Sequence, residues 1–132
     1  MIMKKLYALL VLGIISNSLL SQTWTKLNTG IVTPLNSLYF VNENVGYACG
    51  ENGTIIKTIN SGYTWDSLTS GTTQLLNDLY FINSDTGFVV GGTPDGGHGI
   101  VLKTTNGGST WLQSQICSNV ITSVQFINST TG

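Results

Sequence analysis

The sequence predicts an all-β protein built from repeated four-stranded sheets. Of its 132 residues, 41% are apolar, only 8% are charged and 16 are glycine. This composition is too apolar for a disordered chain and too poor in charge for a helical bundle. Tryptophan occurs at positions 24, 65 and 111, so consecutive tryptophans are 41 and 46 residues apart. Each interval holds four short β-type runs separated by Asn, Gly, Ser, Asp and Thr, the residues of tight turns.

The first 21 residues are predicted to be a signal peptide. The start, Met1–Lys5, is basic, the apolar run Leu6–Ile15 is too short to span a bilayer, and small polar residues follow. Cleavage is expected after Ser21, with Ser18 as the alternative site, and a membrane anchor or a buried helix is the competing interpretation. Cleavage would export residues 22–132 to the periplasm, the cell surface or the medium, with no stable membrane span.

The charge balance excludes two classes of partner. After cleavage three lysines remain against six acidic residues, a net charge of −3, and the chain has no arginine. Nucleic acids and anionic lipid headgroups are bound through clustered basic side chains. Neither is therefore expected as a partner.

A period near 40 residues with four strands per repeat is typical of a β-propeller, in which each sheet, or blade, packs between two others. The repeats are predicted at about 24–65, 65–111 and 111–132, the third truncated. The first strand of each repeat is apolar on both faces, which agrees with burial between neighbouring blades. Strands are expected in the first repeat at Leu35–Val41, Tyr47–Cys49, Thr54–Ile59 and Thr64–Leu68; in the second at Leu75–Ile82, Phe88–Val90, Ile100–Thr105 and Thr110–Gln113; and as leading and trailing strands at Thr23–Leu27 and Ile121–Ile127.

Two complete blades cannot close a ring, since propellers need about four to eight. The sequence is therefore expected to be a fragment of a larger propeller. Its exposed sheet faces would need the remaining blades, or other copies of the chain, to cover them. The leading strand, which contains Trp24, is expected to pair with the last blade of the ring.

One turn motif occurs twice with identical spacing, between the third and fourth strands of each repeat. In its pattern, Thr-x-Asn-x-Gly-x-Thr-Trp, the Asn side chain is expected to accept hydrogen bonds from N–H groups two residues on. The Gly is expected to adopt a positive φ, and the Trp ring to cover the hairpin, so the motif is interpreted as structural. Its residues are Thr58, Asn60, Gly62, Thr64 and Trp65 in the first repeat and Thr104, Asn106, Gly108, Thr110 and Trp111 in the second.

These turns resemble Asp-box (BNR-type) repeats, with Asn in place of the usual Asp. Together with the recurring phrases Leu38–Asn42, Gly46–Gly50 and Thr54–Thr58, they make residues 24–132 similar to the photosystem II stability/assembly factor-like propellers. The resemblance implies a propeller of seven or a similar number of blades and, in the prototype, a role in assembling photosystem II. The prototype's interaction surface is arginine-rich, whereas this chain has no arginine. The fold and the repeat are therefore carried over, and the photosystem role is not.

No catalytic, cofactor-binding or metal-binding set is expected. Asp-box repeats also occur in sialidases, but that chemistry clamps the substrate carboxylate with arginine, and the six acidic residues here are scattered rather than paired. Asp95 and His98, in a Gly-rich insertion of the second repeat, form a candidate binding loop with too few ligands for a metal. Cys49 is expected to be a buried thiol, and a disulfide with Cys117 is the less favoured alternative.

The expected function is that of a non-catalytic module for protein–protein interaction or assembly. The alternative is a carbohydrate-binding module of the cell surface, because aromatic rings can stack on sugars. The candidate rings are Tyr39, Tyr47, Tyr63, Tyr80 and Trp24. Of these, Tyr39 and Tyr80 are expected in the core between blades, and Tyr63 on the surface. A sialidase-like glycosidase fragment is the weaker alternative.

Overall fold

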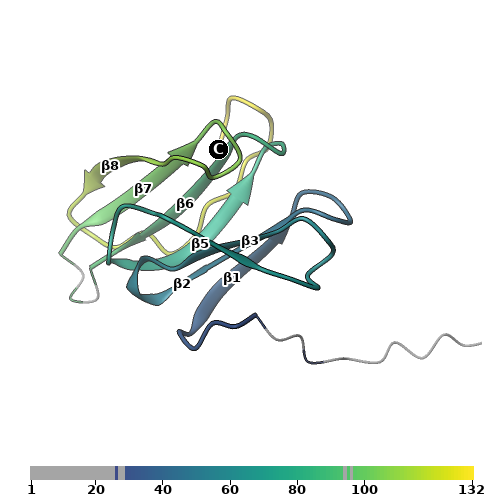
Figure 1. The fold of residues 1–132 in the computed structure, drawn as a ribbon. Helices are drawn as coiled ribbons and strands as arrows, with labels where there is room; N and C mark the ends of the chain where they lie inside the picture. Colours follow the sequence, from purple (N-terminus) through teal and green to yellow (C-terminus); the bar gives the residue numbers. More distant parts are fainter. Residues whose placement is uncertain (1–25, 27–28, 94, 96) are drawn as a thin grey trace, which may run out of the picture.

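The chain forms two antiparallel four-stranded sheets that pack face to face (Figure 1). The computed structural model describes residues 26, 29–93, 95 and 97–132, so the predicted signal peptide and Trp24 lie outside the described residues. The first sheet comprises β1 (Leu35–Phe40), β2 (Gly46–Gly50), β3 (Ile55–Thr58) and β4 (Asp66–Leu68), with the short 3-10 turn η1 (Glu51–Gly53) between β2 and β3; the second comprises β5 (Leu75–Phe81), β6 (Gly87–Gly92), β7 (Gly99–Thr104) and β8 (Leu112–Cys117).

Within each sheet the strands lie in chain order, β1-β2-β3-β4 and β5-β6-β7-β8, joined by short hairpins. The two sheets are the two predicted blades, and the all-β prediction is confirmed. The fourth strands begin two residues later than expected, at Asp66 and Leu112. The reason is local: the N–H of Thr64 donates to the side chain of Asn60, so this residue still belongs to the turn.

The expected trailing strand, Ile121–Ile127, is wrong as a strand, because the segment has no ladder partner among the described residues. A β-ladder needs a neighbouring backbone, and none of the described strands pairs with this segment. The segment instead lies along the second sheet through isolated contacts. The N–H of Ile121 donates to the Gly91 carbonyl at 3.1 Å, and the ring of Phe126 stacks on Phe88 at a centroid distance of 4.6 Å.

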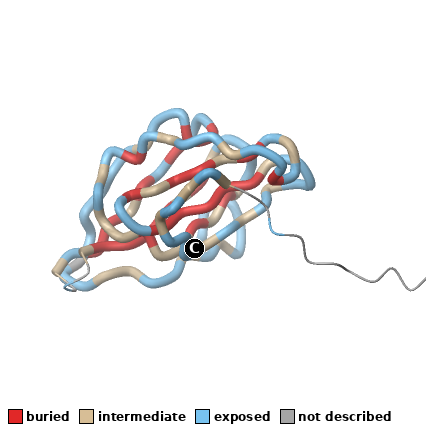
Figure 2. The backbone as a smooth tube through the Cα atoms, turned by 60° about the horizontal axis from the view of Figure 1, so that its bottom comes forward, coloured by how far each residue is buried: buried red, intermediate tan, exposed pale blue. Residues whose placement is uncertain are grey.

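The hydrophobic core lies between the two sheets, and Figure 2 shows the buried residues concentrated in the strands rather than in the loops. At its centre the rings of Tyr47 and Phe81 are stacked with centroids 3.8 Å apart. Both side chains are fully buried. The remaining buried members of the core are Cys49, Ile55, Leu76, Leu79, Val89, Ile100 and Leu102.

The glycine that opens β2 and β6 has a packing explanation. A Cβ atom on Gly46 would lie 2.8 Å from the ring of Phe40, and one on Gly87 would lie 2.5 Å from the ring of Phe81. Real Cβ atoms do not approach that closely, so any larger residue would displace the ring. The glycine that begins this phrase in each repeat therefore makes room for an aromatic ring of the preceding strand.

The linker between the two blades is docked onto η1 through Gly53. The Gly53 N–H donates to the Gln74 carbonyl at 2.8 Å, its φ is +67°, and a Cβ atom would collide with the Thr72 carbonyl oxygen. Gly71, in the same linker, also has a positive φ (+79°), but a Cβ atom there would meet nothing within 4 Å. A Cβ atom at Gly71 would therefore meet only an unfavourable backbone conformation, whereas one at Gly53 would also lack space.

We expect Gly71→Ala to lower the free energy of unfolding by about 1 kcal/mol, because a Cβ atom disfavours the left-handed region. Gly53→Ala should lose about 2 kcal/mol more, because it also forces the linker away from η1. Urea unfolding of both variants followed by tryptophan fluorescence measures the difference. Equal losses would contradict the docked linker.

Candidate functional site

The two Asp-box-type turns have the same hydrogen-bond geometry. In the first, the Oδ1 of Asn60 accepts from the N–H of Thr64 at 2.9 Å and from the hydroxyl of Thr58 at 3.0 Å, while its Nδ2 donates to the Thr64 hydroxyl at 2.9 Å. The Asn acceptor thus bonds an N–H group four residues on, and not two as expected. The Oγ1 of Thr58 also accepts from the Gly62 N–H at 2.9 Å, and Gly62 has a φ of +87°.

The second turn repeats these contacts around Thr104 and Asn106. The Oδ1 of Asn106 accepts from the Thr110 N–H and the Thr104 hydroxyl, each at 3.0 Å, and its Nδ2 donates to the Thr110 hydroxyl at 2.9 Å. The tryptophans differ. The indole N–H of Trp65 donates to the Gly62 carbonyl at 3.0 Å, whereas that of Trp111 is buried without a hydrogen-bond partner among the described residues.

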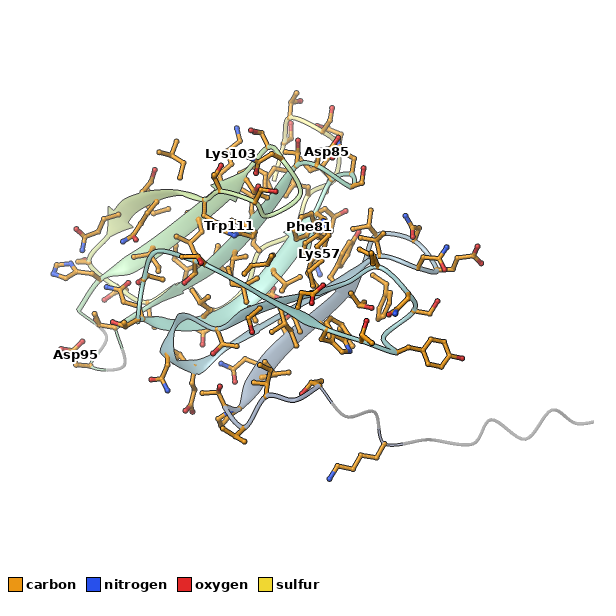
Figure 3. All side chains as sticks on the ribbon, viewed as in Figure 1. Lys57, Phe81, Asp85, Asp95, Lys103 and Trp111 are labelled. Atoms are coloured by element: carbon orange, nitrogen blue, oxygen red, sulfur yellow. The ribbon has the colours of Figure 1, made fainter. Side chains whose placement is uncertain are left out.

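The second turn is also where the first blade is attached to the second. The hydroxyl of Tyr47 donates to the Gly107 carbonyl at 3.1 Å, and the ammonium of Lys57 donates to the same carbonyl at 3.0 Å. Lys57 lies over the Tyr47 ring, 5.3 Å from its centroid. Figure 3 shows Lys57 close to Phe81, at the junction between the sheets. The turn motif therefore serves the contact between blades as well as its own hairpin.

A carboxylate joins three consecutive repeats at corresponding positions. The Oδ1 of Asp78 accepts from the hydroxyl of Ser37 at 2.7 Å, and its Oδ2 accepts from the hydroxyl of Ser123 at 2.7 Å and the N–H of Val124 at 3.0 Å. Ser37, Asp78 and Ser123 occupy the same position in their repeats. We call this group the Asp78 clamp.

Two opposing effects set the pKa of the Asp78 carboxyl. Burial raises the pKa, while the hydrogen bonds from Val124, Ser37, Ser123 and the Leu79 N–H lower it by more, so it lies below its ordinary value. Burial, with the nearby Asp78 charge adding to it, raises the pKa of the Cys49 thiol to about 12. Cys49 is a buried free cysteine, and its thiol is unreactive in this state because the thiolate is the nucleophile.

Beside the clamp, a β-bulge occurs at the same place in both sheets. The register shifts between Leu35 and Ser37 in the first sheet and between Leu76 and Asp78 in the second. The residue left out of each ladder is an asparagine. Asn36 donates its side-chain N–H to the Leu76 carbonyl at 2.8 Å, and Asn77 donates to the Ile121 carbonyl at 2.9 Å.

Sequence reasoning missed the clamp and the bulge asparagines. Their signal was available, since Asn36 and Asn77 each stand directly between a leucine and a residue with a hydrogen-bonding side chain, Ser37 or Asp78. A third set was also missed: Asn42, Asn83 and Asn128 each accept two backbone N–H bonds, which close the turn after β1, after β5 and after the segment Ile121–Ile127.

The candidate loop with Asp95 and His98 lies at the β6–β7 hairpin, at the opposite end of the second sheet from Asp85 (Figure 3). The Oγ1 of Thr93 accepts from the N–H groups of Gly97 and His98, at 2.9 and 3.1 Å, and the Oδ1 of Asp95 accepts from the Gly97 N–H at 3.1 Å. Hydrogen bonds from Thr93 and Gly97 lower the pKa of the Asp95 carboxyl. The carboxylate is therefore used in closing the hairpin turn.

No group of three or more His, Cys, Asp or Glu side chains that could hold a metal ion occurs in the part of the chain that the structure describes. The acidic residues also differ in burial: five of the six are exposed, and only Asp78 is partly buried. Among the described residues, no helix has the length and apolarity needed to cross a membrane.

A groove of about 710 Å³ lies between the blades on the side of η1 and the linker. Its walls are residues 52–55, residues 67–74 and Gln113 of β8, together with Ile31. None of these wall residues is charged, and most of the polar groups among them are hydroxyls and amides. We call it the linker groove.

A second hollow, of about 340 Å³, lies on the outer face of the first sheet and includes Leu35, Leu38 and Trp65. Leu38 is 59% exposed there, whereas Leu79, its counterpart in the second repeat, is 3% exposed because the first blade covers it. The outer face of the first sheet thus leaves exposed a leucine whose counterpart in the second sheet is buried.

The comparisons with known proteins agree with this geometry. The family model described as photosynthesis system II assembly factor YCF48 matches residues 16–120. The chain belongs to the YCF48 family. Among solved structures, the one described as "YCF48 bound to D1 peptide" is 29% identical to the chain, with a TM-score of 0.53, and the match covers 70% of this chain. No curated protein matches the chain.

The match covers 28% of that YCF48 chain, so the present sequence spans little more than a quarter of its length. Membership in the YCF48 family confirms the predicted resemblance, and the likeness to the solved YCF48 structure agrees with an incomplete propeller. That relative is a complex with a D1 peptide, so its own ligand is a polypeptide.

Replacing Asn106 by Asp should change the free energy of unfolding by less than about 0.5 kcal/mol. An Asp oxygen still accepts from the Thr110 N–H, and the Thr110 hydroxyl can turn to donate to the second oxygen. Asn106→Ala should lose about 2 kcal/mol, because it leaves several backbone and hydroxyl groups without partners. Thermal or urea unfolding of the two variants tests this, and an equally damaging Asn106→Asp would contradict the assigned geometry.

The Asp78 clamp should contribute stability that depends on pH. Because the folded pKa is lowered, the contribution is present above the ordinary carboxyl pKa of about 4 and is lost as the pH falls through the folded value. At neutral pH, Asp78→Asn should lower the free energy of unfolding by about 2 kcal/mol, and the difference from the parent chain should shrink in acid. Asp85→Asn, which changes an exposed carboxylate, is the control; a difference independent of pH would contradict the clamp.

Proposed function

We propose that the chain is an exported, non-catalytic module that binds a polypeptide segment of a partner protein. The observation that carries the proposal is its membership in the YCF48 family, in which a solved relative is bound to a D1 peptide. Export is supported by the basic start and apolar run of the first 21 residues. We carry over the class of ligand, a peptide, and not the photosystem itself.

The linker groove is the surface that we assign to the peptide. Hydroxyl and amide side chains can donate to and accept from the alternating N–H and C=O groups of an extended backbone. The residues that form the groove are uncharged, so the part of the peptide that lies in it is expected to be uncharged as well. Thr73 and Gln113 line the groove and are exposed.

A fluorescently labelled D1 peptide, titrated with the full chain and followed by anisotropy, tests the proposal. We expect saturable binding that weakens about tenfold, equivalent to about 1.4 kcal/mol, in the double variant Thr73→Ala/Gln113→Ala. Tyr63→Ala, on the Asp-box side of the first blade, is the matched control and should bind like the parent chain. Absence of saturable binding, or equal affinity in the groove variant, would refute the assignment.

Carbohydrate binding remains a second candidate, favoured by one observation: the Tyr63 ring is 78% exposed on its turn. Tyr47 is fully buried, Tyr39 and Tyr80 lie 5.0 Å apart in a tilted pair, and Trp24 lies outside the described residues. On a glycan array, this candidate predicts binding that Tyr63→Ala abolishes. The glycosidase alternative predicts turnover of a fluorogenic sialoside, and we propose that none occurs.

A further inference from the structure

The chain contains two Asn-Gly dipeptides, Asn52-Gly53 and Asn106-Gly107. Asparagine followed by glycine is chemically labile, because the glycine nitrogen can attack the side-chain amide carbon and no Cβ atom on the glycine obstructs the approach. The same dipeptide thus occurs in two local structures, which allows the effect of each structure on this reaction to be compared.

Asn106 is held in place by its side chain. Its Oδ1 accepts two hydrogen bonds at 3.0 Å and its Nδ2 donates one at 2.9 Å, all within the second turn. The N–H of Gly107 donates to the Asp85 carbonyl at 2.9 Å, and the Gly107 carbonyl accepts from Tyr47 and Lys57. Rotation of the Asn106 amide toward the Gly107 nitrogen would break all of its side-chain bonds.

Asn52 lies at the middle of η1, is exposed, and has a positive φ of 55°. Its side chain makes no hydrogen bond to the described residues. The nitrogen of Gly53 is bonded to the Gln74 carbonyl at 2.8 Å, much as Gly107 is bonded to Asp85. The nucleophiles of the two sites are therefore similarly restrained, and the sites differ in the freedom of the asparagine amide.

We propose that Asn52 is a modification site at which the folded chain deamidates without an enzyme. The Gly53 nitrogen forms a bond to the Cγ of Asn52, its proton leaves with the side-chain amide as ammonia, and a succinimide ring closes. Water from the solvent then opens the ring at either carbonyl, giving aspartate or isoaspartate at position 52. No oxidant or reductant is needed, because the net change exchanges ammonia for water.

The modification changes the linker groove, which Asn52 lines. Either product adds a carboxylate beside Glu51, at the rim of a groove whose wall residues are uncharged. Aspartate tolerates the left-handed backbone that Asn52 adopts. Isoaspartate inserts an additional methylene into the main chain directly before Gly53, which shifts Gly53 relative to the Gln74 carbonyl that its N–H binds and to the Thr72 carbonyl packed against it. The isoaspartate product should therefore release the linker from η1.

The test is incubation of the full chain in mildly alkaline buffer, followed by proteolysis and mass spectrometry of the two Asn-Gly peptides. We expect the mass shift of amide-to-acid conversion to accumulate several-fold faster at Asn52 than at Asn106. In concentrated urea the two sites should react at similar rates, because the sequence around the reacting bond is then all that matters. Asn52→Gln, which retains an amide on a longer side chain, should remove the fast reaction.

Two outcomes would overturn the proposal. One is equal rates at Asn52 and Asn106 in the folded chain, since the freedom of the side chain would then have no effect. The other is protection of both sites in the folded chain with reaction only in urea, since the bond from Gly53 to Gln74 would then suffice to block attack. Both outcomes leave the peptide-binding proposal intact, because that depends on anisotropy with the unmodified chain.

Discussion

Neither sheet of this chain can bury its apolar residues alone, and the packing of one blade against the next is the constraint on which the other features depend. A single four-stranded sheet has two faces and no interior. The stacked pair Tyr47 and Phe81 belongs to different sheets, and the core around it draws on both. The bulges, the Asp78 clamp and the Lys57 contact all lie at junctions between repeats. The residues that recur in each repeat therefore form the contact between blades as well as the blade itself.

Repetition of the junction explains which parts of the fold could be predicted from the sequence. Tryptophan spacing, turn residues and apolar runs recur in register, so the number of sheets and most strand positions followed from pattern alone. The trailing strand was wrong because a β-strand is defined by its pairing with a neighbouring strand. The apolar pattern of residues 121–127 does not show whether such a neighbour is present. The starts of the fourth strands were wrong for a smaller reason, since Thr64 has a β-type side chain but bonds within the turn.

The candidate site was harder to predict. Asn60 and Asn106 were singled out, yet the pattern could not tell which N–H groups they bind, because the oxygen of an asparagine side chain can reach several nearby backbone positions. The Asp78 clamp was missed because its three residues are far apart in sequence and two of them are serines, which are common in turns. The linker groove combines residues of both blades, so only their packing creates it.

The Asp78 clamp has a consequence for the conditions in which the blades stay together. Its negative charge is held by two hydroxyls and backbone N–H groups, with no lysine among its bonded partners in the described part of the chain. Dissolved ions weaken attraction between opposite charges, but they have little effect on short bonds between a carboxylate and neutral donors. The attachment of three successive repeats at this point should therefore depend little on the salt concentration.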